Sequence, residues 1–106
     1  MQVNISDRDI EELILTGKNN KYKVYSKDKR FMAGLARAYK IMHIVANAEG
    51  LRPYSFLHYE KLAHKVNLSS VRVMNGRVER LLFNEINDGI EITIMELNSN
   101  HYGSKK

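Results

Sequence analysis

The chain lacks cysteine altogether and has a single proline, Pro53. Without cysteine there is no disulfide and no thiolate metal site. No apolar run approaches the roughly 20 residues that a membrane-spanning helix needs. The N-terminal MQVNISDRDI has neither the basic nor the apolar region of a secretory signal. These absences lead us to expect a cytoplasmic protein with no membrane partner, no metal site and no cofactor.

What the chain does contain is enough for one folded domain. Of its 106 residues 43% are apolar and 27% are charged, a balance typical of globular proteins. We find no internal repeat, no low-complexity segment and no linker that would divide it. The expectation is a single domain over 1–106 with one modest core.

Positive charge gathers in the middle of the chain. Residues 1–17 carry one base and four acids, whereas 18–40 carry eight bases and one acid, and 52–80 carry six bases and two acids. A basic stretch of this kind is typical of a polyanion partner, above all nucleic acid. The alternative is a lysine-rich helix face that is simply hydrated.

Two helices are predicted in the first half. The first spans about 6–16, with Ser6 as the N-cap and Gly17 at the end. The second spans about 27–48 and is capped by Ser26. Both have apolar residues at helical spacing, so each should bury one face.

Three strands are predicted in the second half, at about 70–74, 77–84 and 90–97. Asn75-Gly76 separates the first two, and Asn87-Asp88-Gly89 separates the last two, and both are hairpin signals. The predicted fold class is therefore α+β, with two N-terminal helices packed on one face of a small antiparallel sheet.

The length of the first hairpin loop decides which side chains share a face. A two-residue turn would mix valines with Arg80 and leave neither face apolar. A three-residue loop with Gly76 in the left-handed conformation gives one apolar and one polar face. In that preferred register Val71, Val73, Leu81 and Phe83 are buried, and Ser70, Arg72, Arg80 and Leu82 face the other way. In the last strand, Ile90, Ile92 and Ile94 should face the core.

The preferred register brings Arg72 and Arg80 together on an open sheet face. Like charges on adjacent strands disfavour folding by some tenths of a kcal/mol, so an anion-binding role is the more economical interpretation. In the alternative interpretation Glu79, Glu91 or Glu96 neutralises them, or they are hydrated. His101 and Tyr102 follow the last strand closely.

Five segments, taken in order, resemble one family. They are F-L-H-Y-E-K-L (56–62), S-V-R-V (70–73), E-R-L-L-F (79–83), I-E-I-T-I-M-E-L (90–97) and N-H-Y (100–102). With the order of helices before a sheet, they are similar to toxins of the RelE/ParE superfamily in type II toxin–antitoxin pairs. The greatest similarity is to the HigB-type and RelE-type messenger-RNA endonucleases.

The resemblance implies a metal-independent endoribonuclease that cleaves messenger RNA on the ribosome. The ribose 2′-OH attacks the adjacent phosphate, which requires a base, cations for the phosphorane and an acid for the leaving oxygen. It also implies inhibition of translation and a cognate antitoxin, usually one that carries a helix-turn-helix domain.

The resemblance also implies roles for particular residues. Arg80 and Arg72 would bind the scissile phosphate, since arginine binds phosphate bidentately. His101, or alternatively Tyr102, would be the acid or base. The implied RNA-binding residues are His58, Lys61 and Arg77.

One departure keeps other functions open. Glu79 stands where the family has an aromatic residue before the second arginine. A ParE-like toxin that inhibits DNA gyrase is one alternative, although such chains generally lack a His-Tyr pair. A non-catalytic RNA-binding module is the other.

Overall fold

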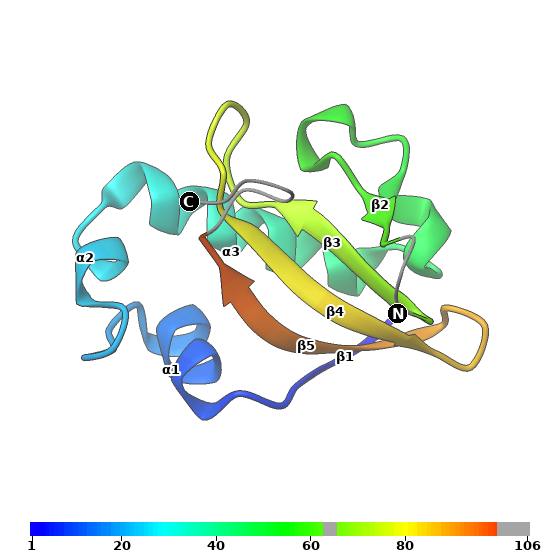
Figure 1. Ribbon diagram of the computed structural model, residues 1–106, viewed down its shortest axis with the longest axis horizontal. Helices are drawn as coiled ribbons and strands as arrows, with labels where there is room; N and C mark the ends of the chain where they lie inside the picture. Colours follow the sequence, from blue (N-terminus) through cyan, green and yellow to red (C-terminus); the bar gives the residue numbers. More distant parts are fainter. Residues whose placement is uncertain (63–65, 100–106) are drawn as a thin grey trace.

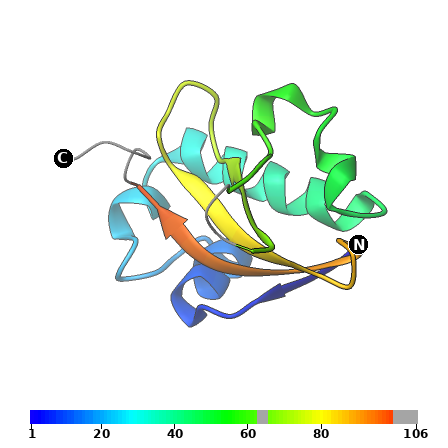
Figure 2. The same ribbon diagram turned by 45° about the vertical axis from the view of Figure 1, so that its right-hand side comes forward.

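A five-stranded mixed sheet with helices on one side forms the fold (Figure 1). The computed structural model describes residues 1–62 and 66–99. The elements, in chain order, are β1 (Gln2–Ile5), α1 (Arg8–Thr16), α2 (Lys23–Ser26), α3 (Lys29–Ile44), the 3₁₀ turns η1 (Ala48–Leu51) and η2 (Ser55–Leu57), β2 (Glu60–Lys61), β3 (Leu68–Arg72), β4 (Arg80–Ile86) and β5 (Glu91–Asn98). The strand order is β1-β5-β4-β3-β2. In both ribbon views α3 lies behind the sheet (Figures 1 and 2).

The predicted α+β class is confirmed, but its finer description is wrong in three respects. A strand, β1, precedes the helices and pairs in parallel with β5, so the sheet is mixed rather than antiparallel. There are three α-helices instead of two, because the connector at 18–25 contains the short helix α2. The long stretch between α3 and β3 also contains 3₁₀ turns and the edge strand β2, so not all helical structure is N-terminal.

Aspartates rather than serines cap the two longer helices. Asp7 accepts a hydrogen bond from the Ile10 amide at 3.0 Å, and Asp28 accepts one from the Phe31 amide at 3.1 Å. Ser6 is not the cap, because its amide and hydroxyl both donate to Ile94 O on β5. Each predicted start is therefore early by one or two residues.

The core lies between α1, α3 and the rear face of the sheet. Phe31 and Leu35 of α3 and Phe83 of β4 are fully buried there. Each such side chain contributes about 1.5–3 kcal/mol by leaving water. The prediction for β5 is confirmed for the two isoleucines at 92 and 94 but wrong for Ile90, which is 56% exposed because β5 begins only at Glu91.

The preferred face assignment of the first hairpin is confirmed. Val71 is opposite Leu81 and Arg72 is opposite Arg80, and the apolar pair is fully buried. The loop is longer than predicted: the Val73 amide bonds Glu79 O, which leaves five residues, 74–78, in the loop. An odd number of loop residues preserves the pattern of faces, and Gly76 has the expected positive φ of 87°.

No helix within residues 1–62 and 66–99 has both the length and the apolar character to cross a bilayer.

Candidate functional site

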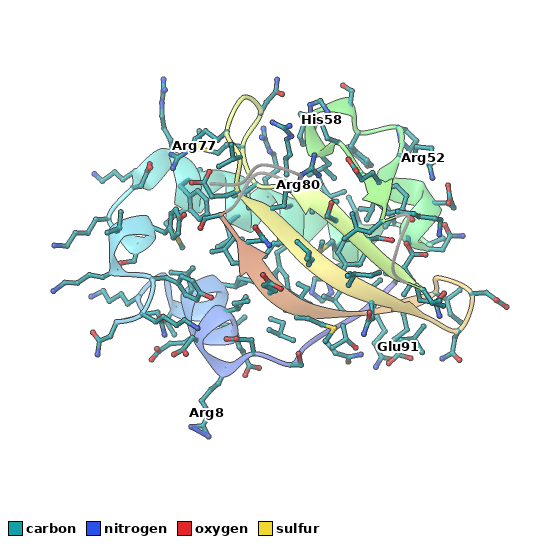
Figure 3. All side chains as sticks on the ribbon, in the orientation of Figure 1. Arg8, Arg52, His58, Arg77, Arg80 and Glu91 are labelled. Carbon is teal, nitrogen blue, oxygen red and sulfur yellow. The ribbon has the colours of Figure 1, made fainter. Side chains whose placement is uncertain are left out.

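Two arginines meet on the sheet face turned away from α3. Arg72 on β3 and Arg80 on β4 are direct cross-strand partners. Cross-strand partners project to the same face, so two positive charges are neighbours there. Figure 3 shows Arg80 beside Arg77 and His58 at one end of the sheet, far from Arg8 and Glu91. We call Arg72 and Arg80, together with Glu60, which pairs with Arg80, the arginine cluster.

Arg80 is held by contacts from three directions. Its Nη1 donates to Ser70 Oγ at 2.9 Å and to His58 O at 3.5 Å, and its Nη2 lies 3.4 Å from Glu60 Oε1. The residue is only 8% exposed, so the expectation of a fully open face is wrong at this position. A guanidinium positioned in this way loses little conformational entropy when it binds an anion.

Arg72 is less completely satisfied. Its Nη1 donates to Arg77 O at 3.0 Å, but its buried Nε has no hydrogen-bond partner among residues 1–62 and 66–99. A buried donor without an acceptor costs about 1–3 kcal/mol. The adjacent charge of Arg80 adds to this cost. An anion bound beside the two guanidinium groups would offset the repulsion between their charges.

Arg77, predicted to bind RNA, is engaged in ion pairs within the protein, and its contact with RNA stays a prediction. It forms a two-pronged ion pair with Glu79, at 3.1 and 3.0 Å, and a further pair with Asp28 at 2.8 Å. The bonds from the Phe31 amide and Arg77 lower the pKa of Asp28. Tyr25 also donates to Glu79, at 3.2 Å. Arg77 therefore ties the hairpin loop to the start of α3, and Glu79 is occupied there instead of neutralising Arg72.

The remaining predicted residues are placed unevenly. His58 lies beside the cluster, and its ring Nε2 is 3.0 Å from Asn75 Oδ1 in the hairpin loop. Lys61 lies on the opposite side of β2 from Glu60, since successive strand residues alternate, and it pairs with Glu85 at 3.0 Å. The structure does not bring Lys61 to the arginines. His101 and Tyr102 lie outside the described residues.

Glu60 is the cluster residue that sequence reasoning missed. It is half exposed, with 51% of its side chain accessible, and pairs across the strands with Ser70. A two-residue edge strand is too short to show the alternation that predicts strands. Its position within F-L-H-Y-E-K-L was the only available signal.

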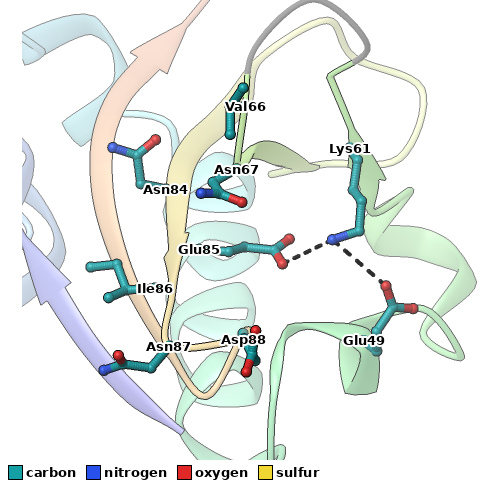
Figure 4. Close-up of a pocket in the computed structure, with 10 residues that line it drawn as sticks. Glu49, Lys61, Val66, Asn67, Asn84, Glu85, Ile86, Asn87 and Asp88 are labelled. Carbon is teal, nitrogen blue, oxygen red and sulfur yellow. Dashed lines mark hydrogen bonds and ion pairs between the residues drawn. The ribbon is translucent and has the colours of Figure 1, made fainter.

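A second polar cluster lies on the other side of β2, at the edge of a hollow of about 900 Å³ (Figure 4). Glu85 accepts hydrogen bonds from Ser69 at 2.6 Å and from the Tyr59 hydroxyl. Lys61 pairs with Glu85 and lies 3.8 Å from Glu49. Acids outnumber bases in this lining, since Glu49, Glu85 and Asp88 face Lys61 alone. The hollow is therefore a poor place for RNA.

The Glu85 cluster stabilises the fold in a pH-dependent way. Burial raises the pKa of Glu85, but the hydrogen bonds from Ser69, Tyr59 and Lys61 lower it by more, so the net pKa lies below its ordinary 4.5. Burial and the Glu85 charge raise the pKa of Tyr59. A carboxyl with a depressed pKa in the folded state stabilises at pH above its ordinary value and loses that contribution as the pH falls through the depressed value.

We expect Glu85→Gln to lower the free energy of unfolding by about 1–3 kcal/mol at neutral pH, because three donors lose a charged acceptor. The difference from wild type should shrink as the pH falls below 4.5, because the Glu85 carboxyl then takes up a proton, first in the unfolded chain and at lower pH in the folded protein. Urea unfolding at pH 7 and pH 3.5 measures this. Glu11→Gln, an exposed change on α1, is the matched control. An equal loss of unfolding free energy at both pH values would show that the charge of Glu85 does not contribute to stability.

No group of three His, Asp or Glu side chains within the described segments is arranged to hold a metal ion. Comparisons with known protein families, curated proteins and solved structures found no match to this chain. The functional argument therefore rests on the residues of the arginine cluster.

Proposed function

We propose that the chain is the toxin of a type II toxin–antitoxin pair, a RelE/ParE-like endoribonuclease of the HigB type that cleaves messenger RNA on the ribosome. The ordered sequence segments and the α+β arrangement support the proposal. Its main support is the direct pairing of Arg72 with Arg80 on the sheet face away from α3, where the buried Arg72 Nε has no partner in the part of the chain that the structure describes.

The cluster has two of the three groups that the reaction requires. Arg72 and Arg80 would bind the scissile phosphate and stabilise the charge that develops on the phosphorane. The carboxylate of Glu60 lies 3.4 Å from the Arg80 guanidinium, so it would reach the 2′-OH beside a phosphate bound there. It would take the proton as the hydroxyl attacks phosphorus.

The bond from phosphorus to the 5′-oxygen then breaks. The products would be a 2′,3′-cyclic phosphate and a 5′-hydroxyl, and the leaving oxygen needs a proton. His101 and Tyr102 remain the candidates for this acid from the sequence. No metal or cofactor takes part in this scheme. The proposed compartment is the cytoplasm, where ribosomes and messenger RNA are found.

An antitoxin would have to neutralise the arginine cluster. An acidic or helical segment that covers the cluster would compete with the phosphate, and a helix-turn-helix domain is the accompanying feature that the resemblance implies. The proposed partners are thus messenger RNA on the ribosome and a cognate antitoxin.

The test is to induce the chain in a bacterium and map messenger-RNA ends. Wild type should arrest growth and give cleavage in phase with codons. Arg72→Ala and Arg80→Ala should each reduce cleavage about 100- to 1,000-fold, the usual effect of removing one group that stabilises developing charge. Arg8→Ala on α1 removes the same charge far from the cluster (Figure 3) and should cleave like wild type. Thermal melts of the purified variants identify any that fail to fold.

Other outcomes would overturn the proposal. Growth arrest with gyrase-dependent DNA damage and no RNA cleavage would indicate a ParE-like toxin. Cleavage that survives both arginine replacements in folded protein would move the active site elsewhere.

A second candidate is a non-catalytic RNA-binding module. It is favoured by the carboxylates that already pair with Arg80 and Arg77, namely Glu60 and Glu79. Such pairs weaken the positive field at the sheet. RNA binding without growth arrest or cleavage would support this candidate.

A further inference from the structure

The outer face of α3 carries positive charge without any acid. The helix has the sequence KRFMAGLARAYKIMHI, in which Lys29, Arg30, Arg37 and Lys40 are all exposed. At 100° per residue these four lie within about one quarter of the helix circumference and extend over roughly 16 Å. None of the ion pairs formed among the described residues includes them. We call these four residues the α3 basic face.

Helix stability does not account for this arrangement. The N-terminal end of a helix carries a partial positive charge, so bases in the first turn are unfavourable and acids are favourable. Lys29 and Arg30 occupy that first turn, which contains no acid. A hydrated face that served only solubility would be more stable with the charges reversed. The placement is therefore better explained by a partner that carries negative charge.

A groove runs along one side of this face. It has a volume of about 430 Å³ and is lined by Arg30, Ala33, Gly34, Arg37, Met74 and Asn75. At Gly34 the helix closely approaches the hairpin, since an added Cβ would lie 2.4 Å from Val73 O. Gly34 and Met74 both line the groove at this point. The two lining arginines stand two turns apart, about 10 Å along the helix.

Arg37 is held in position for an anion. Its guanidinium lies over the Phe56 ring, 4.3 Å from the centroid. A guanidinium that stacks through its face keeps the N–H donors at its edge, and those donors suit phosphate oxygens. Asn75 adds an amide at the opposite rim, where it is fixed by its contact with His58. Charged, ring-stacked and amide groups side by side are typical of a backbone-binding surface for RNA.

We infer that the α3 basic face binds the phosphodiester backbone of an RNA, as a second surface beyond the arginine cluster. This inference rests on the proposed function only because both take RNA as the partner. Contacts to phosphate position RNA without reading its sequence. Its contribution should be electrostatic and hence sensitive to salt.

The test measures binding of a short hairpin RNA in which every 2′-hydroxyl is methylated, so that no cleavage by 2′-OH attack can occur. Fluorescence anisotropy gives the dissociation constant in KCl from about 50 to 200 mM. Arg30→Gln/Arg37→Gln should weaken binding and reduce the slope of log K against log salt by about 1.5, since each lost phosphate contact accounts for about 0.7–0.9. Arg8→Gln should retain the wild-type slope. The double variant loses the stacking of Arg37 on Phe56 but also loses a base from the positive end of the helix, so its melting temperature should lie close to that of wild type.

The inference would be overturned if the double variant had the wild-type salt slope. It would also be overturned if Arg8→Gln reduced the salt slope by as much per charge removed as the double variant does. A variant that binds RNA normally but loses affinity for an acidic polyglutamate peptide would overturn it too, since the partner would then be a protein. The probe cannot be cleaved, so this experiment is independent of the nuclease proposal. If the chain is not a nuclease, natural RNA will not be cleaved, but the salt slope measured with this probe will be unchanged.

Discussion

Glu60→Gln is expected to lower the single-turnover rate of messenger-RNA cleavage about 100-fold or more, the usual effect of losing a general base. The amide keeps the size of the side chain, and its oxygen can still accept from Arg80. It cannot take a proton from the 2′-OH. Because Glu60 is half exposed, the fold should tolerate the change. Cleavage of ribosome-bound messenger RNA by the purified variant measures the rate.

The same substitution separates catalysis from electrostatic screening. If Glu60 only weakens the positive field of Arg72 and Arg80, its neutralisation should raise both RNA affinity and cleavage rate. Glu96→Gln removes an exposed charge from the same sheet face, opposite Leu82, and is the matched control. A faster Glu60→Gln enzyme, or equal losses in the two variants, would refute the proposed base.

Gly34→Ala is expected to lower the free energy of unfolding by about 2–3 kcal/mol, within the usual range for overpacking. An added Cβ would lie 2.4 Å from Val73 O and 3.2 Å from Met74 Cγ. The first neighbour is backbone in the hairpin next to the arginine cluster, so it cannot move aside cheaply. Urea unfolding provides the measurement.

Helix propensity alone predicts the opposite sign. Alanine is about 1 kcal/mol better than glycine inside a helix, so without the contact Gly34→Ala would stabilise. Ala36→Gly, an exposed change on the same helix, should cost about that 1 kcal/mol and calibrates the propensity effect. A more stable Gly34→Ala protein would mean that the helix and hairpin are not in close contact.

Patterns with a period of two or of 3.6 residues made much of the fold predictable. The apolar stripe of α3 and the alternation in β3 and β4 identified these elements and their buried faces. The hairpin shows both the strength and the limit of such patterns. Parity alone placed Arg72 with Arg80, but three and five loop residues give the same parity, so the loop length stayed undetermined.

Charged side chains were harder to predict, because their partners come from distant segments. Arg77 pairs with Asp28, 49 residues earlier, and this contact exists only once α3 lies against the hairpin loop. Lys61 turned away from the arginines because β2 pairs with β3 in one particular register. Glu60 reached Arg80 for the same reason. β1 was missed because its four residues become a strand only beside β5.

The local order of residues therefore determined by itself that the chain contains amphipathic helices and a sheet with one buried face. It also determined that two arginines share the other face of the sheet. Those features follow from the geometry of neighbouring residues along the chain. The tertiary structure alone decided which cations are already occupied and which are open to a partner. Arg77 is neutralised by Asp28, the N-cap of α3, and by Glu79, whereas within the described residues Arg72 has a buried donor without an acceptor and the α3 basic face forms no ion pair. Such differences arise from side chains that approach one another only after long-range packing, and local sequence does not encode those distances.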